Sequence, residues 1–488
     1  MEQEKSDLEA IERVEEHKIS PASGKSEFIP PTAEEEAQVI RKIDYNVLPL
    51  TFVLYSLSVL DRSNLGNARL AGLQEDVGLV GNQYAWLGTV FYISYILFQW
   101  TIMGWKQFKP HRWAAIVVFL WGFDATIQAT VFNWGGLMAC RFFLGIFEAA
   151  FGPGVPLYFT FLYPREKVGF RHGIFISGAA MANAYGSALA YGISQIKGSV
   201  APWKILFIIE GIPTCLLAIV TWYFLPDDPD GCRFLDQRQK DVAKYLISKG
   251  QKSDSKDHKS GLRINELGEA FRDPKAYIPG LMYFSCNVSF ASLPLFVPTI
   301  IHEMGAFTSI QSNGLSAPPY LLCFFVIIAL TYFSDHFKMR GPFCGFAALI
   351  SAIGFIVLAT TDGVASRYIG VFLAVQIFAS VALLLAWTAN MHASESRKAG
   401  GYTILATIGQ CGPLLGTNMF PDDEKPVFRK GMWVSASFSL LVVVLSVLLS
   451  LWLRHENQKL DRQGVTAPRS NAAVDEDTGE EKEYRYQW

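Results

Sequence analysis

Four charged residues lie inside otherwise apolar segments of this chain. Asp61 and Arg62 end the first apolar run, and Arg141 and Glu148 belong to the fourth. Arg141 and Glu148 are seven residues apart, or about two helical turns, so a helix places both on one face. Charged side chains within an apolar span are costly and usually mark a site that binds a substrate or an ion. Two cations and two carboxylates at one place can hold a carboxylate and a proton together.

These four charges are expected to divide into two roles. Arg62 and Arg141 are predicted to bind substrate, because the planar guanidinium makes paired hydrogen bonds to a carboxylate. Glu148 and Asp61 are predicted to take up and release a proton, because a carboxyl in an apolar surrounding favours its neutral form. If the first run leads outward and the fourth inward, Glu148 lies about 10 Å deeper than the other three, from a rise of about 1.5 Å per residue. A purely structural salt-bridge network between the two helices is the alternative interpretation.

Polar residues in the second half of the chain are further candidates for substrate contacts. The seventh run contains Asn287 together with Pro294 and Pro298, and prolines with polar residues in a span indicate a broken helix that lines a cavity. Late in the tenth run, Trp387 and Asn390 can add stacking and hydrogen-bond contacts. We therefore include Asn287, Trp387 and Asn390 in the predicted substrate site. Ordinary packing is the alternative role for all three.

Two further acids are weaker candidates, Asp124 in the third run and Glu210 in the sixth. Glu210 precedes Gly211-Ile212-Pro213, and such a stretch tends to break a helix. We therefore favour a structural role for Glu210.

Small residues form stripes on the fifth and eleventh runs. Residues at a spacing near four lie on one helix face and let two helices approach closely. Such stripes are either faces along which two halves of a molecule slide or static packing surfaces. They consist of Gly178, Ala182, Gly186 and Ala190 in the fifth run, and of Gly409, Gly412 and Gly416 in the eleventh.

The apolar runs that carry these residues predict a polytopic membrane protein. The chain is 51% hydrophobic and only 18% charged, against about 25% charged residues in a soluble domain. A helix needs about 20 apolar residues to cross a bilayer, and the sequence lacks the alternation of a membrane barrel. We predict an all-α membrane protein with twelve transmembrane helices in two pseudo-symmetric six-helix bundles. The runs are 46–65, 84–104, 113–133, 135–158, 172–196, 204–225, 276–300, 315–334, 343–361, 368–391, 400–420 and 431–453.

Charge-rich segments divide the chain and orient it. Lysine and arginine gather in the loops on the same side as the N-terminus, which places both termini and the linker in the cytoplasm. The basic cluster between Lys425 and Lys430 is an exception to this asymmetry. The expected parts are a disordered N-terminus (1–42), an N-terminal bundle (43–225), a cytoplasmic linker (226–275), a C-terminal bundle (276–453) and a disordered tail (454–488).

Several classes of function are disfavoured by the sequence. It contains no nucleotide-binding loop, nucleophile elbow or metal-ligand spacing, so we expect no enzyme, no metal and no cofactor. The seven cysteines form no CxxC pair, which argues against a redox or metal site. No basic face with interleaved aromatic residues indicates nucleic acid. The N-terminus lacks the basic and apolar regions of a cleaved signal peptide.

Several motifs together resemble the major facilitator superfamily, and more narrowly the fungal allantoate- and nicotinate-permease-like branch of the anion:cation symporter family. The resemblance covers about Arg41 to Asp461. The motifs are RKID at 41–44, LDRSNLGNA at 60–68, RFFLGIFEA at 141–149, LFIIEG at 206–211 and FLPDDP at 224–229.

The resemblance implies a transporter that moves a small organic anion with protons across the plasma membrane, and we expect it to be monomeric. In that family, residues matching Arg62, Arg141 and Glu148 handle the anion and the proton. The second-span histidine of some animal members is absent, and the loop after the second span lacks the usual acidic residue. Coupling through that histidine is therefore excluded, and coupling through Glu148 is a hypothesis. Proton-coupled uptake of a small organic anion is the leading hypothesis. Efflux of a secondary metabolite is the alternative, and a nutrient-sensing receptor is a third hypothesis.

Overall fold

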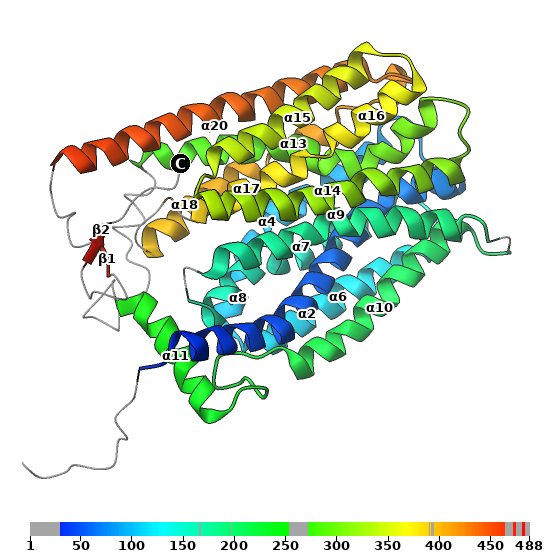
Figure 1. Cartoon of the computed structure of the whole chain (residues 1–488). Coiled ribbons are helices and arrows are strands. Elements are labelled where there is room, and N and C mark those ends of the chain that lie inside the picture. Colours follow the sequence, from blue (N-terminus) through cyan, green and yellow to red (C-terminus); the bar gives the residue numbers. More distant parts are fainter. Residues whose placement is uncertain are drawn as a thin grey trace, which may run out of the picture.

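The computed structural model describes residues 30–164, 167–196, 198–252, 272–389, 391, 395–463, 472–474 and 481–483. Within these ranges the chain is helical, apart from loops and two short strands, β1 (Ala472–Val474) and β2 (Glu481–Glu483), which pair antiparallel. Figure 1 shows long helices stacked in two layers, with the blue-to-green helices of residues 33–224 in one layer and the green-to-red helices of residues 274–463 in the other.

The N-terminal bundle contains six helical passes, two of which are interrupted. The second pass bends by 48° between α4 and the short helices that follow, and the fourth changes from α7 to α8 near Pro153. Its helices are α2 (Ala33–Ala68), η1 (Arg69–Leu73), α3 (Gln74–Val77), α4 (Gln83–Leu97), η2 (Gln99–Met103), α5 (Gly104–Gln107), α6 (Pro110–Gln128), α7 (Trp134–Phe151), α8 (Gly154–Leu162), α9 (Val168–Ile193) and α10 (Pro202–Phe224).

A linker with one described helix, α11 (Gln237–Lys252), leads to a C-terminal bundle that again makes six passes. The tenth and eleventh passes are each built from two consecutive helices. The helices are α13 (Pro274–Glu303), α14 (Ser309–Phe337), α15 (Gly341–Thr360), α16 (Val364–Ala374), α17 (Ile377–Ala389), α18 (Glu395–Gly409), α19 (Gly412–Gly416) and α20 (Arg429–Gln463), with the short η4 (Asp422–Glu424) before α20.

Nine described helical segments are long and apolar enough to cross a membrane by themselves, and the bent pair around Phe98 makes a tenth. The two remaining passes are α9 and the pair α18–α19, which carry the small-residue stripes. Small residues lower the hydropathy of a helix, so these passes depend on their neighbours for burial. The predicted all-α fold of two six-helix bundles is confirmed.

Some helix ends differ from the expected boundaries. Helix α2 begins at Ala33, because Thr32 and Glu35 form a capping box in which each side chain accepts from the other residue's backbone N–H. Residues 33–42 are therefore helical. At the other end, α20 continues to Gln463, so the first part of the expected tail is also helical. The expected disorder of residues 1–29 falls outside the described residues.

Helix α13 is continuous over 30 residues, so the predicted break in the seventh span is wrong. Serine hydroxyls bond back to carbonyls one turn earlier, as Ser285 does to Leu281 and Ser292 to Val288. Pro294 nevertheless lines a cavity, as the next subsection describes.

Both small-residue stripes pack inside a bundle. A Cβ at Gly178 would lie 2.8 Å from Ser56 Oγ on α2, and Gly186 lies against Leu60 of the same helix. In the second half, Gly412 and Gly416 lie against backbone carbonyls of α13. The fifth pass therefore packs on the first as the eleventh packs on the seventh, which is the expected pseudo-symmetry. The stripes are static packing surfaces, and the sliding interpretation is not supported.

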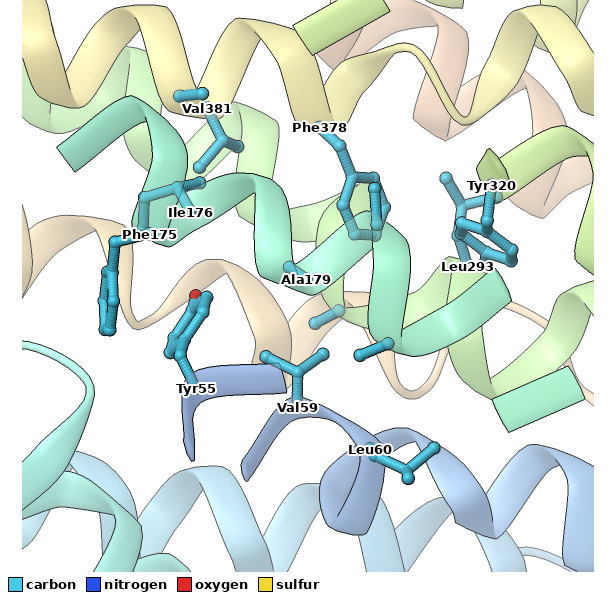
Figure 2. Close-up of a cluster of buried hydrophobic side chains, with 14 of the residues drawn as sticks. Tyr55, Val59, Leu60, Phe175, Ile176, Ala179, Leu293, Tyr320, Phe378 and Val381 are labelled. Atoms are coloured by element: carbon cyan, nitrogen blue, oxygen red, sulfur yellow. The ribbon is translucent and has the colours of Figure 1, made fainter. Parts of the chain in front are cut away.

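The two bundles meet along α9 and α14, along α2 and α13, and along α9 and α17. Figure 2 shows this interface, where Phe378 and Val381 of α17 lie beside Ile176 and Ala179 of α9. Most of these side chains are apolar and almost completely buried. Burial of these apolar side chains stabilises the contact between the bundles through the hydrophobic effect.

Candidate functional site

An ion pair between Arg62 and Glu148 joins α2 to α7. Arg62 Nη2 lies 2.7 Å and Nε 3.2 Å from Glu148 Oε2, and Ser58 Oγ donates to the same oxygen at 3.0 Å. Glu148 is fully buried, whereas the Arg62 side chain is 16% exposed. The Cα–Cβ bonds of a helix tilt toward its N-terminus. Since α2 and α7 run in opposite directions, this tilt brings the two side chains together across the expected difference in depth.

Aromatic rings surround the Arg62 guanidinium. Its central carbon lies 5.0 Å from the ring centre of Phe91 and 5.2 Å from that of Tyr95, both on α4. Contacts of this kind stabilise a desolvated cation by about 0.5–2 kcal/mol. They help to hold the guanidinium in place.

Arg141 lies beside this pair and has vacant donors. Its Nη1 donates to the backbone carbonyl of Asp61 at 3.1 Å and to that of Arg62 at 3.4 Å. Arg141 is 1% exposed, and its Nε and Nη2 have no hydrogen-bond partner among the described residues. A buried guanidinium with unused donors is energetically unfavourable unless an acceptor occupies the space beside it.

A cavity lies between the bundles at this point. Arg62, Ser63, Tyr92, Arg141 and Asn183 are its polar lining residues. The rest of its lining is apolar and comes from both bundles, for example Leu87 and Phe91 on α4, and Phe290, Pro294 and Phe378 in the C-terminal bundle.

Asp61 faces away from this cavity. It is adjacent to Arg62 in α2, but successive side chains on a helix point in different directions, and Asp61 is not among the lining residues. It is 1% exposed, and neither carboxyl oxygen has a hydrogen-bond partner among the described residues. The expected single cluster of four charges is therefore divided. Arg62 and Arg141 line the cavity, Glu148 is buried behind Arg62 as its partner, and Asp61 is not in contact with the cavity.

The three predicted contacts from the C-terminal bundle do not gather at the cavity. Asn287 donates to the Gly409 carbonyl at 3.0 Å and thereby joins α13 to α18. Trp387 is fully buried and packs against Gly341 at the start of α15. Asn390 lies outside the described residues. In this conformation Asn287 and Trp387 have packing roles.

Sequence analysis missed several residues that line or support the cavity. Ser58 precedes Arg62 by four positions, so helical spacing alone places it on the face that carries Arg62. Phe290 and Phe378 gave no such signal, because each lies in a span that is apolar on all sides. Their place in the site follows only from how α13 and α17 pack.

One end of the molecule is closed by contacts between the bundles. We call the end that carries Arg69, Tyr84 and Asp422 the distal end; α2 begins at the opposite, proximal end. Arg69 is paired with Asp422, and its guanidinium lies 4.3 Å from the ring centre of Tyr84. The Tyr84 hydroxyl donates to the Leu295 carbonyl at 3.1 Å.

Two further bonds close the distal half of the interface, where α4 meets the end of α19. Thr89 Oγ1 lies 2.9 Å from Thr417 Oγ1, and Asn418 Nδ2 donates to Thr89 at 3.0 Å. Together with the Arg69–Asp422 pair, these bonds join the two bundles on the distal side of the interface. The distal entrance to the cavity is therefore shut in this structure.

Comparison with known proteins agrees with this architecture. Residues 51–417 match the family model of the Major Facilitator Superfamily. A major facilitator-type transporter, hxnP, of Emericella nidulans is 30% identical over 443 residues, which cover 88% of each chain. The high-affinity nicotinic acid transporter of Saccharomyces cerevisiae is 29% identical over 88% of this chain and 80% of its own.

Solved structures share the fold at low sequence identity. The proton:xylose symporter XylE of E. coli superimposes with a TM-score of 0.61 at 15% identity, over 84% of this chain and 96% of its own. A bacterial homologue of the lysosomal transporter Spinster, in an inward-facing conformation, gives 0.58 at 16% identity, over 84% and 96%. Twelve helical passes, a cavity between two bundles and these matches lead to one conclusion: the chain belongs to the Major Facilitator Superfamily and is a multi-pass membrane transporter of small molecules, not an enzyme.

Proposed function

We propose that this transporter imports a small organic monocarboxylate together with protons, as in the anion:cation symporter branch to which its motifs are similar. Arg141 carries the proposal. A desolvated guanidinium with unused Nε and Nη2 at the wall of a cavity is suited to a carboxylate, because a charged acceptor completes its hydrogen bonds and offsets its buried charge.

The lining of the cavity limits the body of the substrate. Phe91, Phe290 and Phe378 offer ring faces and edges, whereas Ser63 and Asn183 offer few polar contacts. A polyhydroxylated acid would leave hydroxyl groups without partners, at a cost of about 1–3 kcal/mol each. The favoured substrate is a carboxylate on a flat or apolar body. The nicotinic acid transporter among the relatives makes nicotinate the natural first probe.

The Arg62–Glu148 pair supplies a way to couple the anion to a proton. While Glu148 is ionised, it holds the Arg62 guanidinium in the ion pair. Protonation of Glu148 weakens the pair and releases Arg62 toward the cavity. A released Arg62 and Arg141 can then both contact the carboxylate. Proton and anion therefore favour each other's binding, which is a positive coupling free energy between two sites.

Alternating access of the two bundles completes the proposal. We propose that bundles 43–225 and 276–453 rock about the apolar interface, connected by the linker 226–275. The distal end would face the outside of the plasma membrane, with both termini in the cytoplasm and the protein acting as a monomer. Closure of the distal end then corresponds to the state that exchanges substrate with the cytoplasm.

Transport of radiolabelled nicotinate, benzoate and gluconate in oriented vesicles tests this function. Right-side-out vesicles should accumulate nicotinate or benzoate when the outside is made acidic, and gluconate should not be taken up. Accumulation only in inverted vesicles would instead indicate efflux. Equal uptake of gluconate would contradict the inferred substrate class.

A further inference from the structure

Three basic side chains gather at the proximal end, where the second pass connects to the third. Lys106 lies on the short helix α5, Lys109 directly precedes α6, and Arg112 lies in the first turn of α6. All three are exposed, and none forms an ion pair with an acid in the part of the chain that the structure describes. Asp227, which follows α10, is bonded instead to His111, with 2.8 Å between its Oδ1 and the His111 Nδ1. We call Lys106, Lys109 and Arg112 the proximal basic group.

The equivalent connection in the second half of the chain balances its own charge. Phe108-Lys109 corresponds there to Phe337-Lys338, which aligns Lys106 with Asp335. Asp335 forms an ion pair with Arg340, which is buried. A lysine at the position of this acid therefore leaves the first connection without an internal partner for its positive charge, as far as the described residues show.

Arg112 ends the row of α6 side chains that faces lipid. Ile116, Phe119 and Phe123 follow it at helical spacing, and each is about half exposed. In a helix that crosses a membrane, such exposed apolar side chains contact acyl chains. Long basic side chains at the end of a span extend to the headgroups. Arg112 is therefore placed at the depth of the headgroups.

Exposed aromatic side chains lie at the same depth as the basic group. The Arg112 guanidinium lies 5.9 Å from the ring centre of Trp222, which is partly exposed near the end of α10. Helices α6 and α10 pack side by side (Figure 1). Phe108 is more than half exposed and stacks on Trp113, with 5.3 Å between ring centres. Tryptophan gathers where headgroups meet acyl chains, so these rings support the same depth.

An anionic phospholipid fits this combination of charge and apolar surface. Its phosphate can accept hydrogen bonds from Arg112 and the two lysines, and a guanidinium suits a phosphate because it donates in pairs. Its acyl chains can lie along the exposed apolar row of α6. A soluble phosphate would use the cations but not this row.

We propose that the proximal basic group binds the headgroup of an anionic phospholipid at the ends of α5, α6 and α10. In the orientation proposed above, this end of the molecule meets the cytoplasmic leaflet, which carries negatively charged lipids. None of the three basic residues lines the cavity, so the site is separate from the substrate site. The bound lipid holds the connection between the second and third passes at the membrane surface.

Native mass spectrometry of the purified full-length protein tests the site. Phosphatidylserine and phosphatidylcholine with the same acyl chains are titrated separately, and the fraction of lipid-bound protein is measured. The wild type should bind phosphatidylserine more tightly than phosphatidylcholine. Each basic side chain near an anionic headgroup contributes about five-fold to binding, so Lys106→Gln/Lys109→Gln/Arg112→Gln should weaken phosphatidylserine binding about a hundred-fold.

Arg41→Gln/Lys167→Gln/Lys338→Gln is the matched control. These residues are also exposed toward the proximal end and also lack an ion-pair partner among the described residues. The control therefore changes the net charge by the same amount. Its three positions lie on α2, before α9 and after α14, so they do not gather on one connection. This variant should keep the wild-type preference for phosphatidylserine.

Several results would overturn the inference. Equal affinity of the wild type for the two lipids would do so, and this can be read even if a variant fails to fold. Unchanged binding in the first triple variant, or an equal loss in both, would show that the basic group is not a specific site. Displacement of phosphatidylserine by an equal concentration of inorganic phosphate would assign the site to a soluble anion. Because no substrate is present, a failure of nicotinate transport would count against the proposed function and not against this site.

Discussion

Arg69 and Asp422 are 353 positions apart and pair across the two bundles, with Arg69 Nη2 2.7 Å from Asp422 Oδ1 and 2.8 Å from Oδ2. Lys425 Nζ lies 3.1 Å from the same carboxylate and 3.6 Å from Glu303 on α13. Asp422 thus receives one cation from each bundle. Because the pair joins the two bundles at the distal end, we expect it to stabilise the closed state relative to an open one.

Asp422→Asn should shift the protein toward a distal-open state. Because Asp422 is 41% exposed, the ion pair is worth about 1 kcal/mol, or about five-fold in the ratio of the two states. Spin labels can be placed on cysteines at Val80 and Asp362, which lie on opposite bundles at the distal end. In Asp422→Asn a larger fraction of the label pairs should be at the longer distance. Asp423→Asn in the same turn is the control. Equal distance distributions in both variants would show that the pair does not hold the distal end closed.

The distal closure should depend on pH only in strong acid. Burial alone would raise the pKa of Asp422, but the bonds and charges of Arg69 and Lys425 outweigh it and lower the pKa below its ordinary value of 3.8. A carboxyl whose pKa is lower in the closed state than in the open state stabilises the closed state at every pH above its ordinary pKa. This stabilisation is lost as the pH falls through the lowered pKa. The same spin labels should therefore give constant distances from about pH 7 to 5 and opening only below about pH 4. Opening of the distal end between pH 7 and 5 would show that another titratable group controls its closure.

Gly66→Ala should prevent full distal closure. A Cβ at Gly66 of α2 would lie 2.8 Å from the Leu295 carbonyl of α13, and a backbone carbonyl cannot rotate away as a side chain can. The spin-label distance should lengthen and nicotinate accumulation should fall at least ten-fold. Gly192→Ala on α9 is the control, because no heavy atom lies within 4 Å of its added Cβ. Normal transport by Gly66→Ala would mean that this close approach is dispensable.

Arg141→Lys should weaken substrate binding about ten- to a hundred-fold, or about 1.4–2.8 kcal/mol. Lysine keeps the charge but loses the planar fork with its unused Nε and Nη2. Calorimetric titration with nicotinate measures the effect. Arg367→Lys is the matched control. Arg367 is equally buried, at 3% exposed, but donates to the backbone carbonyl of Pro426, away from the cavity. An unchanged affinity of Arg141→Lys for nicotinate would show that the Arg141 guanidinium does not bind the substrate.

The fold and the inner part of the site could be predicted from sequence because their signals are local. Apolar run lengths indicate spans, and charges inside spans identify Arg62, Arg141 and Glu148. The contact between Arg62 and Glu148 depended on one further fact, the opposite tilt of side chains on antiparallel helices. That tilt and the length of the arginine side chain together bridge the separation of about 10 Å that helical rise alone suggests.

Other features could not be predicted because they depend on packing between distant segments. Phe378 and Trp387 lie in one apolar helix, and only the orientation of α17 decides that Phe378 lines the cavity. In the sequence, the acidic segment at 422–424 was notable only because it precedes the basic cluster between Lys425 and Lys430, which is an exception to the distribution of basic residues among the loops. Its partner, Arg69, lies in the other bundle.

Uptake of nicotinate into proteoliposomes tests the coupling of proton and anion most directly, by comparing the wild type with Glu148→Gln. The wild type should accumulate nicotinate when the outside is more acidic than the inside. Glu148→Gln imitates the protonated state, so it should still exchange nicotinate across the membrane but should not accumulate it in response to the gradient. Gradient-driven accumulation by Glu148→Gln at the wild-type level would contradict the role of Glu148. Indifference of the wild type to the gradient would contradict proton coupling itself.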